Sequence, residues 1–177
     1  MSSHSKAETI AKDIKLLILD VDGVLTDGGI YFDDNGTEHK KFDSQDGCGI
    51  KLLELCGVEV AVITARSTRS VAHRLETLGV KNYYHGIKDK GAALKELSKK
   101  LSIDLSESAF VGDDVIDLPA MSRVALPIAV ANAHSFVKEN ALMVTEKAGG
   151  SGAVREVCDF LLKAQNKYDS LMKTFLK

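Results

Sequence analysis

The sequence contains few of the residues that build cross-linked or aromatic-rich proteins. Its 177 residues include no tryptophan, two prolines and three cysteines. Cys48, Cys56 and Cys158 are odd in number and widely spaced, and they form no C-x-x-C pair. This pattern argues against a disulfide framework and against a zinc site. We therefore expect the cysteines to be small buried hydrophobic residues.

The sequence also lacks long apolar runs and an excess of positive charge. The N-terminal segment MSSHSKAETIAKD has no apolar core of the kind found in secretory signals. No run approaches the roughly 18 apolar residues of a membrane span. The formal net charge of −2 gives no general attraction for nucleic acid. We expect a cytoplasmic protein that binds neither nucleic acid nor membranes.

What the sequence does contain is an alternation of short aliphatic runs and helical patterns, as in βαβ units. The length suits one domain over residues 1–177. The predicted strands are 15–19, 58–64, 82–85, 108–112, 127–130 and 142–145, and the predicted helices are 47–56, 68–78, 90–101, 115–122 and one from 152 onward. Because the strands are apolar on both faces, the predicted fold class is α/β: a doubly wound, mainly parallel sheet with helices on both faces.

Two segments depart from this alternation. Residues 28–43 contain two short strand-like runs around Asn35-Gly36, which predicts a β-hairpin with a type I′ turn that protrudes after the first strand. Residues 160–177 form a C-terminal tail with apolar residues at helical spacing. Such a tail usually packs on its own chain or on a neighbouring subunit.

Polar side chains follow the predicted strands at the points where those strands end. They are Asp20 and Asp22, Thr64, Lys90, and Asp113, Asp114 and Asp117. In open α/β sheets, ligands bind beyond the carboxyl ends of the strands, so these groups should meet at one edge. Clustered carboxylates repel one another unless a cation holds them, and oxygen ligands suit Mg²⁺. The lysine suits an anionic substrate.

Each of these features also has an ordinary structural interpretation. An isolated D-x-D is more often a turn or a surface pair than a metal site. Thr64 could cap a helix, Lys90 could belong to a solvated helix face, and GDD is a common loop sequence. The conjunction decides the question, since all of them follow strands in order with helices between. We therefore favour a functional site.

The same segments resemble the motifs of the haloacid dehalogenase-like phosphatases. These motifs match LDVDGVLTD, VITARS, Lys90 and VGDDVIDLP. The segments DGGIYFDDNG, QDGCGIKLL, AVANAH and AGGSGAVREVCDFLLKAQNK are most similar to the 3-deoxy-D-manno-octulosonate (KDO) 8-phosphate phosphatases. The resemblance implies a Rossmann-like fold of the capless subclass, without a cap domain. Where relatives usually read T-G-R, this chain has Thr64-Ala65-Arg66.

Phosphate hydrolysis assigns a role to each polar group. Asp20 is the candidate nucleophile, which would form an aspartyl phosphate. Asp22 is the candidate acid and base, first protonating the leaving oxygen and then deprotonating water. Thr64 and Lys90 would meet the charge on the phosphoryl group. The resemblance implies that Mg²⁺ is held by Asp20, the Asp22 carbonyl and Asp113.

The remaining candidates concern the surroundings of the phosphate. Asp114 and Asp117 are expected to support the metal water and the lysine from behind. Arg66 is either a surface arginine at a helix start or the partner of a sugar carboxylate. The segment AGGSGAVRE is either a flexible turn or an anion site formed by Gly150 and Arg155. The resemblance favours the anion site.

These features lead to a main hypothesis and two alternatives. The main hypothesis is a Mg²⁺-dependent phosphomonoesterase that converts KDO 8-phosphate to KDO, for lipopolysaccharide synthesis as the resemblance implies. The alternatives are a phosphatase of a related nine-carbon sugar acid phosphate and a non-enzymatic phospho-acceptor switch. The resemblance further implies a homotetramer, and we expect each active site to be covered by a neighbour's hairpin and tail. The alternative is a hairpin that folds back on its own subunit as a local lid.

Overall fold

The computed structural model describes residues 3–176 and is built on a six-stranded parallel sheet. The sheet has the order β5-β4-β1-β6-β7-β8, and every neighbouring pair in it is parallel. Its strands are β1 (Leu16–Leu19), β4 (Glu59–Ile63), β5 (Asn82–Tyr84), β6 (Ser108–Gly112), β7 (Leu126–Ala129) and β8 (Met143–Val144). The predicted parallel sheet is confirmed, with each strand within two residues of its expected bounds.

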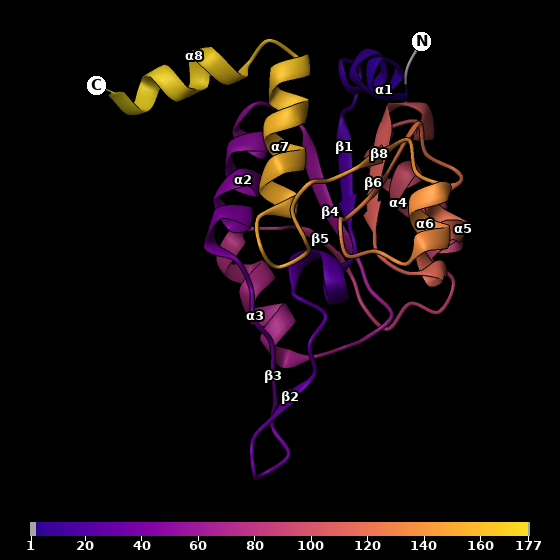
Figure 1. Cartoon of the computed structure of the whole chain (residues 1–177), viewed down its shortest axis with the longest axis vertical. Helices are drawn as coiled ribbons and strands as arrows, with labels where there is room; N and C mark the ends of the chain where they lie inside the picture. The colour runs from indigo at the N-terminus through magenta and orange to yellow at the C-terminus, as the bar shows by residue number, and fades with distance from the viewer. Residues whose placement is uncertain (1–2, 177) are drawn as a thin grey trace.

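Helices cover both faces of this sheet, as the doubly wound fold class requires (Figure 1). The helices are α1 (Ser3–Ala11), α2 (Ser44–Leu55), α3 (Arg69–Leu78), α4 (Lys90–Leu101), α5 (Leu118–Met121), α6 (Ser135–Glu139), α7 (Ala153–Ala164) and α8 (Tyr168–Lys173). Helices α1, α2 and α7 pack together on one side, and α4 packs with α5 on the other. The strands β1 and β6 between these layers are buried throughout, which places the core at the centre of the sheet.

Helices α1, α2, α5 and α6 differ from the prediction, and the predicted helix 115–122 is a 3₁₀ turn, Val115–Asp117, followed by α5. Helix α2 begins at Ser44 rather than at 47, because the Asp43 side chain accepts the amides of Gln45 and Asp46 and so caps the helix earlier. Helices α1 and α6 were not predicted. Helix α1 is anchored by the small buried residue Ala7, which gives little hydrophobic periodicity. Helix α6 has only five residues, too few for a periodic pattern.

The hairpin is present, but the predicted type I′ turn is wrong. Strands β2 (Tyr31–Phe32) and β3 (Glu38–His39) pair in antiparallel fashion. Asn35 is not among the described residues with positive φ, whereas Gly36 has φ 77°. A type I′ turn needs positive φ at both central positions. The Gly36 amide instead donates to the Asp33 carbonyl over 2.9 Å, so a type I turn is followed by a left-handed glycine.

The expectation of buried cysteines is correct for Cys158 and wrong for Cys48. Cys158 is buried, Cys56 is partly buried and Cys48 is exposed. Cys48 lies on α2 between two buried glycines that face the neighbouring helices. A Cβ at Gly47 would meet Arg74 of α3, and one at Gly49 would meet Arg155 of α7. The glycines therefore lie on the two faces of α2 that pack against other helices, and the Cys48 side chain faces solvent.

The C-terminal tail is a bent pair of helices rather than one continuous helix. Helix α7 ends at Ala164, Asn166 adopts φ 57°, and α8 follows. The left-handed residue redirects the chain, and Figure 1 shows α8 extending sideways from the end of α7. Within residues 3–176, we find no helix that is both long and apolar enough to cross a membrane.

Candidate active site

The site begins where β1 ends and the chain makes one wide turn. The Thr26 amide donates to the Val21 carbonyl over 3.0 Å, which closes the turn Val21–Leu25. Gly23 within it has φ 88°, and a Cβ there would lie 2.1 Å from an Asp113 carboxylate oxygen. Glycine is therefore required at this position of the D-x-D-G motif for two physical reasons: the backbone is left-handed, and Asp113 approaches closely.

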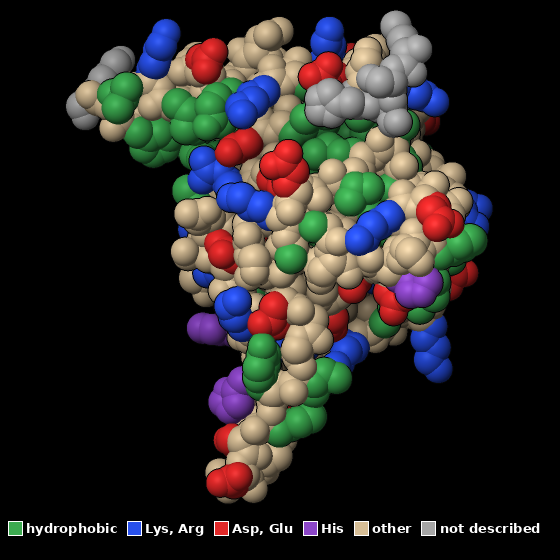
Figure 2. Space-filling model, viewed as in Figure 1, with side chains coloured by type: hydrophobic (Ala, Val, Ile, Leu, Met, Phe, Trp, Pro, Cys, Tyr) green, Lys and Arg blue, Asp and Glu red, His purple; other side chains and the backbone are tan. Residues whose placement is uncertain are grey.

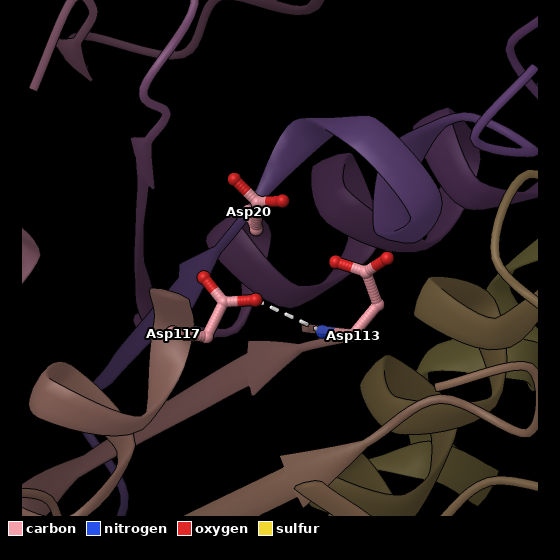
Figure 3. Close-up of side chains that lie close together, drawn as sticks. All are labelled: Asp20, Asp113 and Asp117. Carbon is pink, nitrogen blue, oxygen red and sulfur yellow. Dashed lines mark hydrogen bonds between the residues drawn. The ribbon is translucent and has the colours of Figure 1, made fainter. Parts of the chain in front are cut away.

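Three carboxylates from two neighbouring loops meet beside this turn. One oxygen from each of Asp20, Asp113 and Asp117 lies within 4.8 Å of the others, and Figure 3 shows the three side chains converging. The Lys90 ammonium, with a side chain 1% exposed, lies 2.6 Å from Asp20 and 2.6 Å from Asp117. The sequence-based prediction that these residues share one edge of the sheet agrees with this arrangement.

Asp117 is fully committed to protein partners. One of its oxygens accepts from Lys90, and the other accepts the amides of Asp113 and Asp114 over 3.0 and 3.3 Å. A Cβ at Gly112 would lie 2.6 Å from the Asp117 side chain, so the glycine of the VGDD motif makes room for it. Since both Asp117 oxygens are occupied, Asp20 and Asp113 are the carboxylates left to bind a cation.

The charge balance of the cluster favours a cation. Burial raises the pKa of Asp20, as does Asp117, while Lys90 acts in the opposite direction. Burial also raises the pKa of Asp113 to about 8, with further contributions from Asp20, Asp117 and Asp114. One lysine therefore does not compensate these carboxylates. A hard, oxygen-binding divalent cation such as Mg²⁺ fits the donor set.

A cavity of about 230 Å³ opens in front of the carboxylates. It is lined by Asp20, Asp22, Gly28, Ile30, Thr64, Ala65, Arg66, Asp113, Asp114 and Ile116. The Thr64 side chain accepts the Arg66 amide over 3.3 Å. Ala65 is not among the described residues with positive φ, so alanine is accommodated where relatives usually have glycine.

Gly150 and Arg155 do not line this cavity. The Gly150 amide donates to the Val24 carbonyl over 3.0 Å, so its loop supports the turn behind the cluster. The Arg155 guanidinium pairs with Asp159 over 2.9 Å on the same helix. The Arg155 amide donates to the buried Asp46 over 2.8 Å. Substrate binding by Gly150 and Arg155 therefore stays a prediction.

Sequence reasoning missed two residues of the hairpin that reach the site. The Lys40 ammonium, with a side chain 1% exposed, bonds to Asp22 and lies 2.9 Å from Glu38. Glu38 also pairs with Arg66 over 2.8 Å. Burial lowers the pKa of Lys40, but hydrogen bonds to Asp22 and Glu38 outweigh it and raise the pKa. The E-x-K spacing was the available signal, because it puts both side chains on one face of an extended strand.

Comparison with known proteins places this geometry in a family. Residues 84–157 match the model of the haloacid dehalogenase-like hydrolases. A KDO 8-phosphate phosphatase KdsC of Escherichia coli K12 is 50% identical over 165 residues, which cover 92% of this chain and 88% of that protein.

Two solved structures have the same fold over nearly their whole length. A KDO 8-phosphate phosphatase of Moraxella catarrhalis, in complex with magnesium, phosphate and KDO, has a TM-score of 0.94 and 43% identity, covering 97% of this chain and 98% of that one. The cobalt-bound deoxy-D-mannose-octulosonate 8-phosphate phosphatase of Haemophilus influenzae has a TM-score of 0.90 and 38% identity, covering 95% and 99%. With this identity and coverage, the chain belongs to the haloacid dehalogenase-like hydrolases, in the family of KDO 8-phosphate phosphatases.

Proposed function

We propose that this protein hydrolyses KDO 8-phosphate to KDO and phosphate, in lipopolysaccharide biosynthesis. The observation that carries the proposal is a single cavity lined by Asp20, Asp22, Thr64 and Arg66. This set offers a nucleophile, a proton carrier, a hydrogen-bond donor for the phosphate group and a partner for the sugar carboxylate, side by side. The names of the relatives support the same substrate.

In the first step, an Asp20 oxygen attacks phosphorus, and the bond between phosphorus and the sugar oxygen breaks. Asp20 suits this role because it faces the cavity and Lys90 holds one of its oxygens in place. Asp22 gives its proton to the departing sugar oxygen, so the product leaves as an alcohol rather than as an alkoxide. The result is an aspartyl phosphate and free sugar.

In the second step, Asp22 takes a proton from water while the water oxygen attacks phosphorus. The bond to Asp20 breaks, and its carboxylate returns with inorganic phosphate as the product. Asp22 thus gives a proton in one step and recovers one in the next. Its position two residues after the nucleophile keeps it beside the same phosphorus throughout.

The surrounding groups meet the charge of the phosphoryl group. Mg²⁺ would be held by Asp20, Asp113 and the Asp22 carbonyl, and when bound it offsets the repulsion between carboxylate and phosphate. The Thr64 hydroxyl donates to a phosphate oxygen, and Lys90 contributes positive charge beneath Asp20. Asp117 holds Lys90 and the amides of Asp113 and Asp114 from behind, whereas Asp114 lines the cavity and accepts the Val115 amide.

Purified protein assayed for phosphate release tests the substrate. KDO 8-phosphate, a nine-carbon sugar acid 9-phosphate and a neutral hexose phosphate should be compared with Mg²⁺ and with EDTA. We expect the highest kcat/KM on KDO 8-phosphate and loss of activity in EDTA. Comparable rates on the neutral hexose phosphate would contradict the substrate assignment, and a preference for the nine-carbon ester would favour the alternative.

We also propose that the protein is a homotetramer in which hairpins and tails cover neighbouring active sites. The hairpin exposes Ile30 by 61% and Phe32 by 63%, and the tail exposes Phe175 by 65% and Leu176 by 85%. Figure 2 shows hydrophobic side chains on the protruding hairpin and along the tail. A two-stranded hairpin is marginally stable alone in water, and subunit packing would bury these side chains.

Light scattering combined with activity measurements tests the assembly. We expect wild-type protein to elute as a tetramer and the Phe32→Glu variant to dissociate, with weaker discrimination between sugar phosphates. Lys41→Glu, which changes an exposed hairpin residue without removing apolar surface, is the control. A stable wild-type monomer with full activity and undiminished selectivity would contradict a cap supplied by a neighbour.

A further inference from the structure

An unbroken series of ion pairs connects the hairpin to both sides of the cavity. Asp22 bonds to Lys40, Lys40 lies 2.9 Å from one oxygen of Glu38, and Arg66 lies 2.8 Å from the other. Asp22 and Arg66 both line the cavity, whereas Lys40 and Glu38 do not. The hairpin residues therefore contact the groups that face the substrate without facing it themselves.

Burial makes the lysine contact more than a surface ion pair. The Lys40 side chain is 1% exposed and that of Glu38 is 17% exposed. Exposed ion pairs restrain side chains weakly, because water competes for both partners. A buried lysine between two carboxylates has few alternative positions, since leaving either partner would strand a charge away from water. This arrangement fixes the Lys40 ammonium and, through it, the carboxyl group of Asp22.

The contact with Lys40 also makes the two carboxylate oxygens of Asp22 inequivalent. Lys40 bonds to one of them, and Asp22 is 28% exposed at the cavity wall. A carboxyl group held by one oxygen can present the other in a constant direction. Proton transfer to a leaving oxygen depends on a short, aligned hydrogen bond in the transition state. The hairpin thus supplies the alignment that a residue in a turn lacks by itself.

We propose that Lys40 is a positioning residue for this enzyme, which orients Asp22 for proton delivery to the leaving oxygen. The inference rests on the proposed phosphatase function. It makes a specific claim about which substrates depend on Lys40. The leaving group of an alkyl phosphate is an unstable alkoxide, which needs the proton. The leaving group of p-nitrophenyl phosphate is a stabilised phenolate, which needs it little.

The experiment compares kcat/KM for KDO 8-phosphate and p-nitrophenyl phosphate, because kcat/KM includes the departure of the leaving group but not the later hydrolysis. Lys40→Met removes the charge and keeps most of the chain length, and Lys40→Arg keeps the charge. Lys41→Met is the matched control, because the neighbouring lysine has a side chain 60% exposed and lies 4.0 Å from Asp27 instead.

We expect Lys40→Met to lower kcat/KM on KDO 8-phosphate about tenfold more than on p-nitrophenyl phosphate, which is part of the roughly 10²–10⁴-fold that general acid catalysis contributes. Lys40→Arg should restore most of the loss, and Lys41→Met should leave the ratio unchanged. Equal losses on both esters would indicate a merely structural role and overturn the proposal. So would an unchanged ratio in Lys40→Met, or a similar change in Lys41→Met.

The wild-type arm separates this inference from the proposed function. If wild-type protein cleaves another alkyl phosphate but not KDO 8-phosphate, the substrate assignment fails, and the Lys40 ratio is measured on that other ester. If wild-type protein cleaves no phosphate ester, the proposed function and the role of Lys40 fail together. If the wild-type protein is a phosphatase, only the kcat/KM ratios of the Lys40 and Lys41 variants can overturn the proposed role of Lys40.

Discussion

Replacing Lys90 by methionine tests the charge balance of the carboxylate cluster. The ammonium lies 2.6 Å from Asp20 and 2.6 Å from Asp117. At an effective dielectric constant of about 20, each contact is worth about 6 kcal/mol in Coulomb energy. The desolvation of the buried lysine offsets several kcal/mol of this. We expect a net loss of about 3–5 kcal/mol in the free energy of unfolding at pH 7.5, as for other buried pairs that lose one partner.

The loss should depend on pH with a definite sign. The folded-state pKa of Asp20 and Asp113 is raised, so the folded cluster holds more protons than the unfolded chain at neutral pH. Removing Lys90 removes an opposing charge and raises these pKa values further. At pH 5.5 the carboxyl groups take up protons, and less uncompensated charge remains. The destabilisation by Lys90→Met should therefore be smaller at pH 5.5 than at pH 7.5.

Urea unfolding in EDTA, followed by circular dichroism at both pH values, measures these differences. The double variant Lys90→Met/Asp117→Asn removes one positive and one negative charge, and it should recover at least 1 kcal/mol of the single variant's loss. Lys95→Met changes an exposed lysine of the same helix and should stay within about 0.5 kcal/mol of wild type. A loss below about 1 kcal/mol at pH 7.5, or an equal loss at both pH values, would refute the reasoning.

Other predictions concern the residues of the reaction and the metal. Asp20→Asn should reduce phosphate release by at least about 10³-fold because an amide is a poor nucleophile, and near-wild-type release would mean that the nucleophile is another residue. Asp22→Asn should lose about 10²–10⁴-fold in rate yet bind Mg²⁺ by calorimetry, whereas loss of binding would contradict coordination through its backbone carbonyl. Because the pKa of Asp113 is raised to about 8, metal-free stability should fall between about pH 4 and 8 and thermal stabilisation by Mg²⁺ should grow over that range, and a pH-independent Mg²⁺ effect would contradict this. Gly23→Ala should weaken Mg²⁺ binding, since its Cβ would lie 2.1 Å from Asp113, and unchanged affinity would show that the loop relaxes freely.

The central part of the fold and of the site follows from local sequence patterns. Asp20 and Asp113 follow apolar runs directly, and parallel strands bring their carboxyl ends to one edge of the sheet. That adjacency needs no knowledge of side-chain contacts. Lys90 is similarly accessible, because it opens a helix whose N-cap, Asp89, is readable in the sequence.

The parts that could not be predicted depend on how separate elements pack. The contact of Lys40 with Asp22 requires the hairpin to fold back over the turn after β1, which no periodicity specifies. The hairpin has a type I turn instead of the predicted type I′ turn because of the Asp33 side chain. This side chain accepts the amides of Asn35 and Thr37 over 2.9 and 2.8 Å and favours a different local geometry. The exposure of Cys48 depends on which face of α2 meets its neighbours.

The position of β1 in the sheet has a consequence for the order in which the protein becomes competent during synthesis. Strand β1 is made early, yet its partner β6 begins at Ser108. The turn that follows β1 is supported by the amide of Gly150. A nascent chain therefore carries the nucleophile for most of its translation without the strand and the loop that hold it in place. Catalytic competence should appear only after the loop that contains Gly150 has left the ribosome, since such long-range pairing forms late.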